Sequence, residues 1–318
     1  MRLLTTIFTF ALIAMGICEL ANAQRGGSFP RAWHDTNPNT NFWVDVGGAV
    51  FDRPGISNNT VVLADSISNQ ILLTIEDITD QQTSFGTNVA FGGVSNRIGA
   101  WDAEATIVNF DTDTSFTGDN LFSPLFNATE LDSLNIDYDS DLASVEFNFR
   151  RPLNRSVTVF AGPRYFRLEE DIVFDTAATV GGMMFTSQND TRTTNSMIGA
   201  QIGGEFRMQL SQSIFVRTHG KFAGFANRIE FSDNFSNSAG FASFTERDQT
   251  VASFIGEVGG RVIHDIVPGA LQSYVGYEAS WLGLSGDDEG VGAGPAAVDN
   301  QGDAIFIHQI LFGFTISR

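Results

Sequence analysis

The stretch SMIGAQIGGEFRMQL, residues 196–210, alternates between apolar and polar side chains. Ile198, Ile202 and Phe206 fall on one side of an extended chain, and Glu205 and Arg207 fall on the other. Successive side chains of a strand point to opposite faces, so we expect a strand with one dry and one wet face. The pattern fits a soluble β-sandwich and a membrane barrel equally well. The rest of the chain has to decide between them.

The beginning of the chain has the pattern of a secretory signal peptide. Arg2 precedes a mostly apolar run, and Ala21-Asn22-Ala23 forms an A-x-A cleavage site. A lipoprotein signal that uses Cys18 is the alternative, but Ile17 is a poor residue directly before a lipidated cysteine. The domains expected from this pattern are a signal peptide at 1–23, a short periplasmic segment at 24–41 and an outer-membrane β-barrel at 42–318.

Composition excludes several classes of protein. Cys18 is the only cysteine, so the mature chain has neither a disulfide nor a thiolate metal site. No later stretch reaches the roughly 18 continuous apolar residues of a membrane-spanning helix. The net charge of -19 argues against nucleic acid as a partner. If the chain crosses a membrane, we expect it to do so with strands.

Ten stretches carry the two-residue period, and the connections between them alternate between short and long. This is the layout of an up-and-down barrel with tight turns at one end and long loops at the other. A sandwich with Greek-key crossings has no reason to keep the alternation. The expected strands are 42–51, 85–95, 100–110, 142–150, 155–167, 196–209, 213–227, 250–264, 271–282 and 304–317. The long connections, which hold most of the acidic residues, are 52–84, 111–141, 168–195, 228–249 and 283–303.

The sequence therefore predicts an all-β fold, a transmembrane up-and-down antiparallel β-barrel of about 10 strands, with 8 to 12 tolerated. It also predicts short periplasmic turns and long acidic extracellular loops. The phase of each strand gives two sets of site residues. The expected lumen-lining residues are Asp45, Asp102, Glu104, Glu146, Arg150, Arg164, Glu205, Arg207, Arg217, His219, Lys221, Glu257, Arg261 and Glu278. The expected lipid-facing residues are Ile198, Ile202, Phe206, Met208, Phe306, Ile310, Phe312 and Phe314.

The charged lumen has two interpretations. It either selects small solutes or ions by charge, or it fills a narrow barrel with salt bridges, and the size scaling of barrels favours the second. Arg217, His219 and Lys221 form a basic stripe on one strand. The stripe is either an anion-selective constriction or a set of partners for acids on neighbouring strands. Pairing is favoured because an unpaired buried charge is costly.

Other chemistry has weaker support. The acidic runs 111–113 and 137–141 resemble calcium ligands, but they lack the glycine and the terminal glutamate of an EF-hand loop. We expect no metal site, no cofactor and no catalytic residue, because no G-x-S-x-G or H-E-x-x-H motif is present. The chain is therefore expected not to be an enzyme.

The segment VTVFAGPRYFRLEEDIVF, residues 157–174, resembles the G-x-R-Y-x-x-L-x-E signature of the β-barrel porin family 7 of planctomycete outer-membrane proteins. Gly162, Arg164, Tyr165, Leu168 and Glu170 carry the similarity. The segments RIGAWDAEATIVNF and YEASWLGLSG are also similar to that family. The resemblance implies a bacterial outer-membrane barrel but supplies neither a catalytic set nor a solute.

Three hypotheses follow from the sequence. The first is a bacterial outer-membrane β-barrel, either a narrow porin-like channel for small solutes or an occluded barrel, with membrane lipid as its partner. The second is a structural or adhesive surface protein that uses the barrel as an anchor and its acidic loops as a contact surface. The third is a soluble secreted β-sandwich. The oligomeric state is not specified by the sequence.

Overall fold

A computed structural model describes residues 42–53, 61–65, 70–74, 77, 82–95, 99–123, 128–284 and 304–317. The expected signal peptide (1–23) and periplasmic segment (24–41) lie outside the described residues. In these described ranges, no helix is both long and apolar enough to cross a membrane.

The described chain forms one closed antiparallel barrel of 10 strands, with two additional short strands. Each barrel strand pairs with the next one along the chain, and the first pairs with the last from Trp43↔Ser317 to Asp52↔His308. The predicted up-and-down barrel is confirmed, with the expected strand count. The barrel strands are β1 (Phe42–Arg53), β4 (Gln82–Ser95), β5 (Gly99–Ser123), β6 (Ala128–Pro152), β7 (Val157–Val180), β8 (Met183–Gln209), β9 (Ile214–Asn237), β10 (Ala242–Val267), β11 (Leu271–Leu284) and β12 (Ala304–Ser317).

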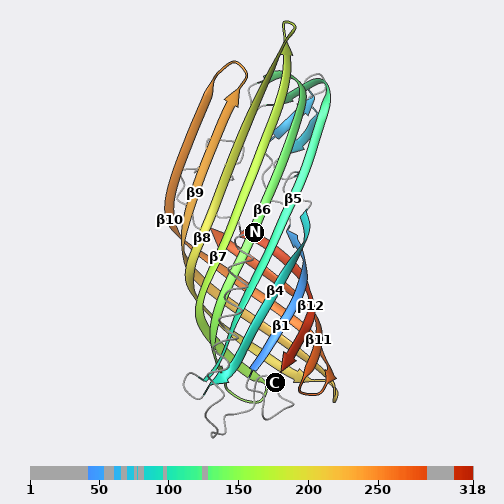
Figure 1. Cartoon of the computed structure of the whole chain (residues 1–318), viewed down its shortest axis with the longest axis vertical. Coiled ribbons are helices and arrows are strands. Elements are labelled where there is room, and N and C mark those ends of the chain that lie inside the picture. Colours follow the sequence, from blue (N-terminus) through green and yellow to red (C-terminus); the bar gives the residue numbers. More distant parts are fainter. Residues whose placement is uncertain are drawn as a thin grey trace.

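The two additional strands, β2 (Val61–Asp65) and β3 (Ile71–Thr74), form a small hairpin beside β5. β2 extends the sheet by pairing Ala64 with Phe122 and Asp65 with Leu121. The hairpin lies near the upper end of β5, above the point where β5 loses β4 as its neighbour (Figure 1). It therefore covers part of an edge that would otherwise leave backbone groups unpaired.

Strands β5 to β10 rise far above β1, β4, β11 and β12 (Figure 1). The expectation of long loops at 111–141, 168–195 and 228–249 is therefore wrong for most of these residues. Pairing of β5 with β6 continues from Asn109↔Asp141 to Ser123↔Ala128, and only Gly181 and Gly182 separate β7 from β8. These connections are tall β-hairpins with short turns.

The reason for this error is an inversion of polarity along the tall strands, which β6 shows most clearly. In its lower part the outward side chains are apolar, as at Val145 and Phe149, and the inward ones are polar. In its upper part the outward side chains are Asp137 and Asp139, while the inward Leu134 is buried. The two-residue period continues along the whole strand, but the apolar side chains move from the outward face to the inward face.

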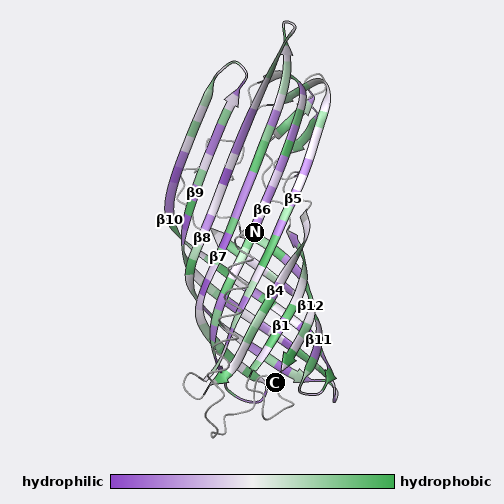
Figure 2. Ribbon diagram, in the orientation of Figure 1, coloured by the Kyte–Doolittle hydropathy of each residue, from purple (hydrophilic) through white to green (hydrophobic). Residues whose placement is uncertain are grey.

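The inward side chains of upper β8 stay polar, as at Asn189 and Thr191. The outward change from apolar to polar occurs on all six tall strands, and Figure 2 shows the change in colour along them. Below it, the outward side chains form an apolar outer band around the barrel; above it, they are polar or charged. The first outward polar residues above the apolar outer band are Asn109, Asp141, Arg167, Ser196, Arg228 and Thr250. Most of them are register partners on neighbouring strands, as in Arg167↔Ser196 and Ser196↔Arg228.

A second hydrophobic core explains why β5, β6 and β7 continue above the band. It lies inside the tall part of the sheet and includes side chains of the β2–β3 hairpin. Burying these apolar side chains supplies the free energy that ordering a free-standing hairpin would otherwise lack. Its buried members are Val62, Leu63, Leu73, Leu121, Leu131, Leu134, Ile136, Tyr138, Ile172 and Phe174.

The close approach of β7 to the backbone of β6 at Gly162 gives the first test of the barrel packing. A Cβ atom there would lie 1.7 Å from the Phe147 carbonyl oxygen, and backbone cannot move aside cheaply. We expect Gly162→Ala to lower the free energy of unfolding by about 1–3 kcal/mol or more. Gly224→Ala is the matched control, because nothing lies within 4 Å of its Cβ position. Urea titration followed by heat-modifiable gel migration measures both. Equal stability of the two variants would contradict the packing described.

Candidate functional site: the barrel interior

The interior below the tall hairpins is filled with charged side chains that come from the inward faces of almost every strand. The structure places the expected lumen residues there, on the row that points away from the apolar outer band. Their arrangement differs from an open pore, because most of them contact one another across the barrel axis. They fall into three groups, described in turn.

The lowest group joins β5, β6, β8 and β9. Arg150 lies 2.5 Å from the carboxylate of Asp102 and 3.1 Å from that of Glu205. Arg217 lies 3.3 Å from the second oxygen of Glu205, so this carboxylate is held between two guanidinium groups. The Arg207 guanidinium lies nearby at the barrel end, 4.2 Å from the centre of the Phe215 ring.

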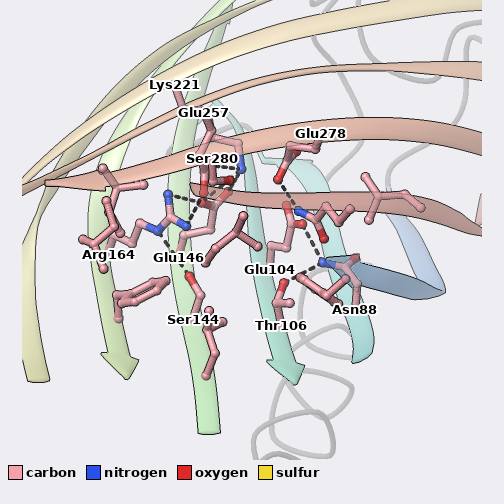
Figure 3. A pocket seen from close by; sticks show the side chains of 18 of the residues that line it. Asn88, Glu104, Thr106, Ser144, Glu146, Arg164, Lys221, Glu257, Glu278 and Ser280 are labelled. Carbon is pink, nitrogen blue, oxygen red and sulfur yellow. Dashed lines mark hydrogen bonds and ion pairs between the residues drawn. The ribbon is translucent and has the colours of Figure 1, made fainter. Parts of the chain in front are cut away.

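The central group is a closed ring of contacts between four charged side chains, one each from β6, β7, β9 and β10 (Figure 3). Arg164 donates to Glu257 at 2.6 Å and lies 3.9 Å from Glu146. Lys221 lies 3.3 Å from each of the same two carboxylates. Two cations and two carboxylates therefore alternate around the ring. This gives each buried charge an opposite neighbour, which a low-dielectric interior requires.

Two amide side chains complete this ring, and the sequence analysis missed them. Asn148 donates to Glu146 at 3.0 Å, and Gln201 donates to the Asn148 side-chain oxygen at 2.8 Å. The Gln201 oxygen in turn accepts from Arg164 at 3.4 Å. Both amides are on the inward row of their strands, so phase would have found them. They were passed over because the search considered only charged residues.

The third group lies around Glu278 and Asp45 on the other side of the barrel. His219 lies 2.7 Å from Glu278, and Gln309 donates to the other oxygen of Glu278 at 2.5 Å. Asp45 accepts from the hydroxyls of Tyr274 and Thr315, both at 2.7 Å. The three residues of the basic stripe thus contact four different acids. Arg217 contacts Glu205, His219 contacts Glu278, and Lys221 contacts Glu146 and Glu257.

Glu104 and Arg261 differ from the other expected residues because both of them line two small cavities. Glu104 accepts from the Asn88 amide at 2.6 Å, and Arg261 lies 4.9 Å from the centre of the Tyr274 ring. Both side chains line each of two small cavities, of about 50 Å³ apiece. Such a volume holds at most a few water molecules. In the described part of the barrel these cavities do not amount to a channel for hydrated solutes.

An apolar layer lies in the interior just above the charged groups, and nothing in the sequence analysis anticipated it. Its side chains follow the charged residues on the same inward rows, as Leu142 follows Glu146 and Phe166 follows Arg164. β4 contributes Gly86, where a Cβ would come within 2.4 Å of the Phe51 ring. The layer comprises Phe51, Val108, Phe110, Leu142, Phe166, Leu168, Met197, Phe225, Ile255, Leu282, Ile307 and Leu311.

The outer surface of the lower barrel carries the expected lipid-facing residues. All of them are at least 45% exposed. Such a continuous exposed apolar surface is unfavourable in water and favourable in contact with lipid. His308 is a polar interruption of this surface, and its Nδ1 lies 2.5 Å from the Tyr277 hydroxyl. The exposed residues are Ile198, Ile202, Phe206, Met208, Phe306, Ile310, Phe312 and Phe314.

The acidic runs that resembled calcium ligands lie above the apolar outer band, on the outward face of β5 and β6. Asp113 pairs with Asp137 and Asp111 with Asp139, so like charges stand directly opposite each other. Partial burial and the Asp113 carboxylate raise the pKa of Asp137, and partial burial together with Asp141 raises the pKa of Asp139. Among the described residues, no group of three or more His, Cys, Asp or Glu side chains could hold a metal ion.

Comparison with known proteins gives only distant structural likenesses. No protein-family model and no curated protein matches the chain, so the resemblance to β-barrel porin family 7 stays a prediction. The chain is similar to the outer membrane protease OmpT of Escherichia coli, with 10% identity over 90% of this chain and 100% of that one and a TM-score of 0.41.

Two further solved structures are similar at the same distance. One is a major outer membrane protein of Thermus thermophilus, at 8% identity over 87% of this chain and 99% of that one, with a TM-score of 0.33. The other is the toluene transporter TodX of Pseudomonas putida, at 8% identity over 87% and 89%, with a TM-score of 0.28. At these values the likeness carries no information about activity.

Removal of the ring's lysine tests the central group. Lys221→Met leaves the Glu146 and Glu257 carboxylates facing each other with Arg164 alone, so we expect a loss of about 3–5 kcal/mol in the free energy of unfolding. Arg228→Met is the control, since Arg228 pairs with Glu230 and Asp248 at an exposed position, where a pair is worth about 1 kcal/mol or less. Chemical denaturation of both refolded variants gives the comparison. A Lys221→Met variant as stable as the control would refute the ring.

The opposed aspartates give a test with a defined pH dependence. The pKa of Asp137 in the folded chain is raised above its unfolded value, so protonation favours the folded state. Stability of the β5–β6 hairpin should therefore rise as pH falls from 7 through the folded pKa, and level off below the unfolded value of about 3.9.

Asp137→Asn should remove most of this pH dependence and stabilise the hairpin at pH 7 by about 0.2–1 kcal/mol. Amide hydrogen exchange in β5 and β6, corrected for intrinsic rates, measures the change. Asp175→Asn is the control, because its cross-strand partners Asn135 and Gln188 are uncharged. An equal gain in the control would show that net charge, and not the opposed pair, is responsible.

Proposed function

We propose that the protein is an outer-membrane β-barrel with an occluded lumen, which serves as an anchor for the tall extracellular part of its sheet. The observation that carries this proposal is the apolar layer across the interior, directly above a charged network with two cavities of about 50 Å³. A barrel that passes solutes needs a continuous hydrated path. An apolar constriction of this kind excludes water and the ions that water carries.

Placement in a membrane is supported by the outer surface. The sheet is closed, so no backbone edge meets lipid in the lower barrel, and the apolar outer band surrounds it. The short turns at one end and the tall hairpins at the other fit a periplasmic and an extracellular side. The expected signal peptide supports export, and outer-membrane lipid is then the barrel's partner.

The proposal combines the occluded barrel of the first hypothesis with the second hypothesis, in which the barrel anchors a surface protein. Strands β5 to β10 present an ordered sheet above the apolar outer band, which is more structure than a narrow channel needs at its mouth (Figure 1). The contact surface is then a sheet and not the set of acidic loops that the sequence predicted. The expectation that the chain is not an enzyme stays a prediction.

Planar-bilayer recording tests the occluded lumen. We expect folded, reconstituted protein to give no ion-conducting steps, because the apolar layer leaves no hydrated path. Arg217→Gln/Lys221→Gln should also be silent, because the apolar layer lies above both positions and is left intact. An open porin reconstituted in the same lipid is the positive control. Regular steps from the wild-type chain would contradict occlusion, and steps from the double variant alone would assign the seal to the charges.

A further inference from the structure

A polar depression of about 440 Å³ lies on the tall part of the sheet, above the apolar outer band and far from the charged interior. Its lining residues come from β6, β7, β8 and β9 and the turn after β9. The upper parts of these strands lie side by side in Figure 1. Its lining consists of serine, threonine, asparagine and glutamine, with one alanine and one aspartate. The second hypothesis from the sequence makes these segments part of a contact surface but assigns no ligand to them.

The register of the strands explains the arrangement of this lining. Asn135 pairs with Asp175, Asp175 with Gln188, and Gln188 with Ser236, so one row crosses four neighbouring strands on the same face. Directly opposed residues have Cβ atoms about 4.5–5.5 Å apart, which gives the row a regular spacing. One step further up, Ser133 and Thr186 flank Ala177 in a second row.

The side chains of the first row have unused hydrogen-bonding capacity. Among the described residues, Asn135, Gln188 and Ser236 make no side-chain hydrogen bond, and they are not among the residues with other contacts. The rows just below differ in this respect. There Arg192 contacts Asp171, and Thr191 donates to Asp233 at 2.8 Å. The polar groups below the depression satisfy one another. In the depression itself Thr176 bonds Ser187, so the unused capacity belongs to the row of Asn135, Gln188 and Ser236.

Charge separates the depression from its surroundings as well. Residues 176–189 and 234–245 contain no charged side chain, in a chain with a net charge of -19. Asp175 is the one carboxylate of the lining, and the lining contains no base. The depression therefore has nothing to pair with a phosphate, a sulfate or a uronate, and the single carboxylate repels them. Ala177 is its one apolar residue, so no large apolar side chain is present to hold a lipid or an aromatic ligand.

We propose that this depression binds a neutral oligosaccharide. Sugar hydroxyls both donate and accept hydrogen bonds, as do the amides and hydroxyls of the lining. A volume of about 440 Å³ is within the range of small-ligand sites and is sufficient for one or two sugar rings. The inference rests on the proposed function only in taking the tall sheet as the extracellular end of an anchored barrel.

Saturation-transfer NMR and calorimetry on the full, detergent-folded chain test the proposal with maltotriose, mannotriose and galactotriose, and with trigalacturonate as an anionic probe. We expect binding of at least one neutral trisaccharide, and at least tenfold weaker binding of trigalacturonate. Asn135→Ala/Gln188→Ala should weaken the neutral sugar at least tenfold, because several hydrogen bonds are lost together. Gln209→Ala is the matched control, a glutamine near the short-turn end that donates to the Ser211 carbonyl, and it should leave binding unchanged.

Each other outcome overturns the proposal. Absence of binding by all three neutral probes does so, as does binding that Asn135→Ala/Gln188→Ala leaves intact. Equal or tighter binding of trigalacturonate would show that the site is not selective for neutral sugars. A calorimetric signal from calcium alone, abolished by EDTA and unaccompanied by sugar binding, would make the depression a cation site. Bilayer recording of the same preparation is independent of all these results, so failure of the sugar site leaves the occluded barrel standing.

Discussion

Closure of the sheet by hydrogen bonds between β1 and β12 is the constraint on which the rest of the molecule depends. The pairing runs from Trp43↔Ser317 to Asp52↔His308 and removes the last free edge of the lower barrel. In hydrocarbon an unpaired backbone group has no water to satisfy it, so only a closed sheet can face lipid. Closure also fixes an interior from which lipid is excluded. Every inward side chain must then find its partner inside the barrel.

That requirement accounts for the composition of the interior. Charges drawn from separate strands neutralise one another, as Arg164 and Lys221 do between Glu146 and Glu257. Above them the inward rows become apolar, and at nearly the same point along the tall strands the outward rows become polar. Both exchanges follow from one cause. Outside the barrel, the surroundings change from lipid to water at this level. Outward side chains above it contact water and are polar, so apolar side chains are buried on the inward face.

The ten barrel strands were predictable from the two-residue period, and the faces of the lower strands from their phase. Two features were not. The tall hairpins were taken for loops because an acidic run such as 137–141 indicates a solvated surface, and the alternate Tyr138 and Leu142 were not weighed against it. The amides Asn148 and Gln201 lie on inward rows that phase identifies, but their contacts with the charged ring depend on how the strands are arranged around the barrel. Periodicity along one strand does not contain that information.

The depth at which the two faces exchange polarity can be measured directly with spin labels on the outward row of β7. Single cysteines at Val159, Tyr165, Glu169 and Asp175, in a reconstituted chain with Cys18 replaced, would carry the label. The account predicts that labels at Val159 and Tyr165 are relaxed by dissolved oxygen and shielded from a water-soluble nickel chelate, with the reverse at Glu169 and Asp175. Nickel accessibility at Val159 and Tyr165 as high as at Asp175 would contradict it.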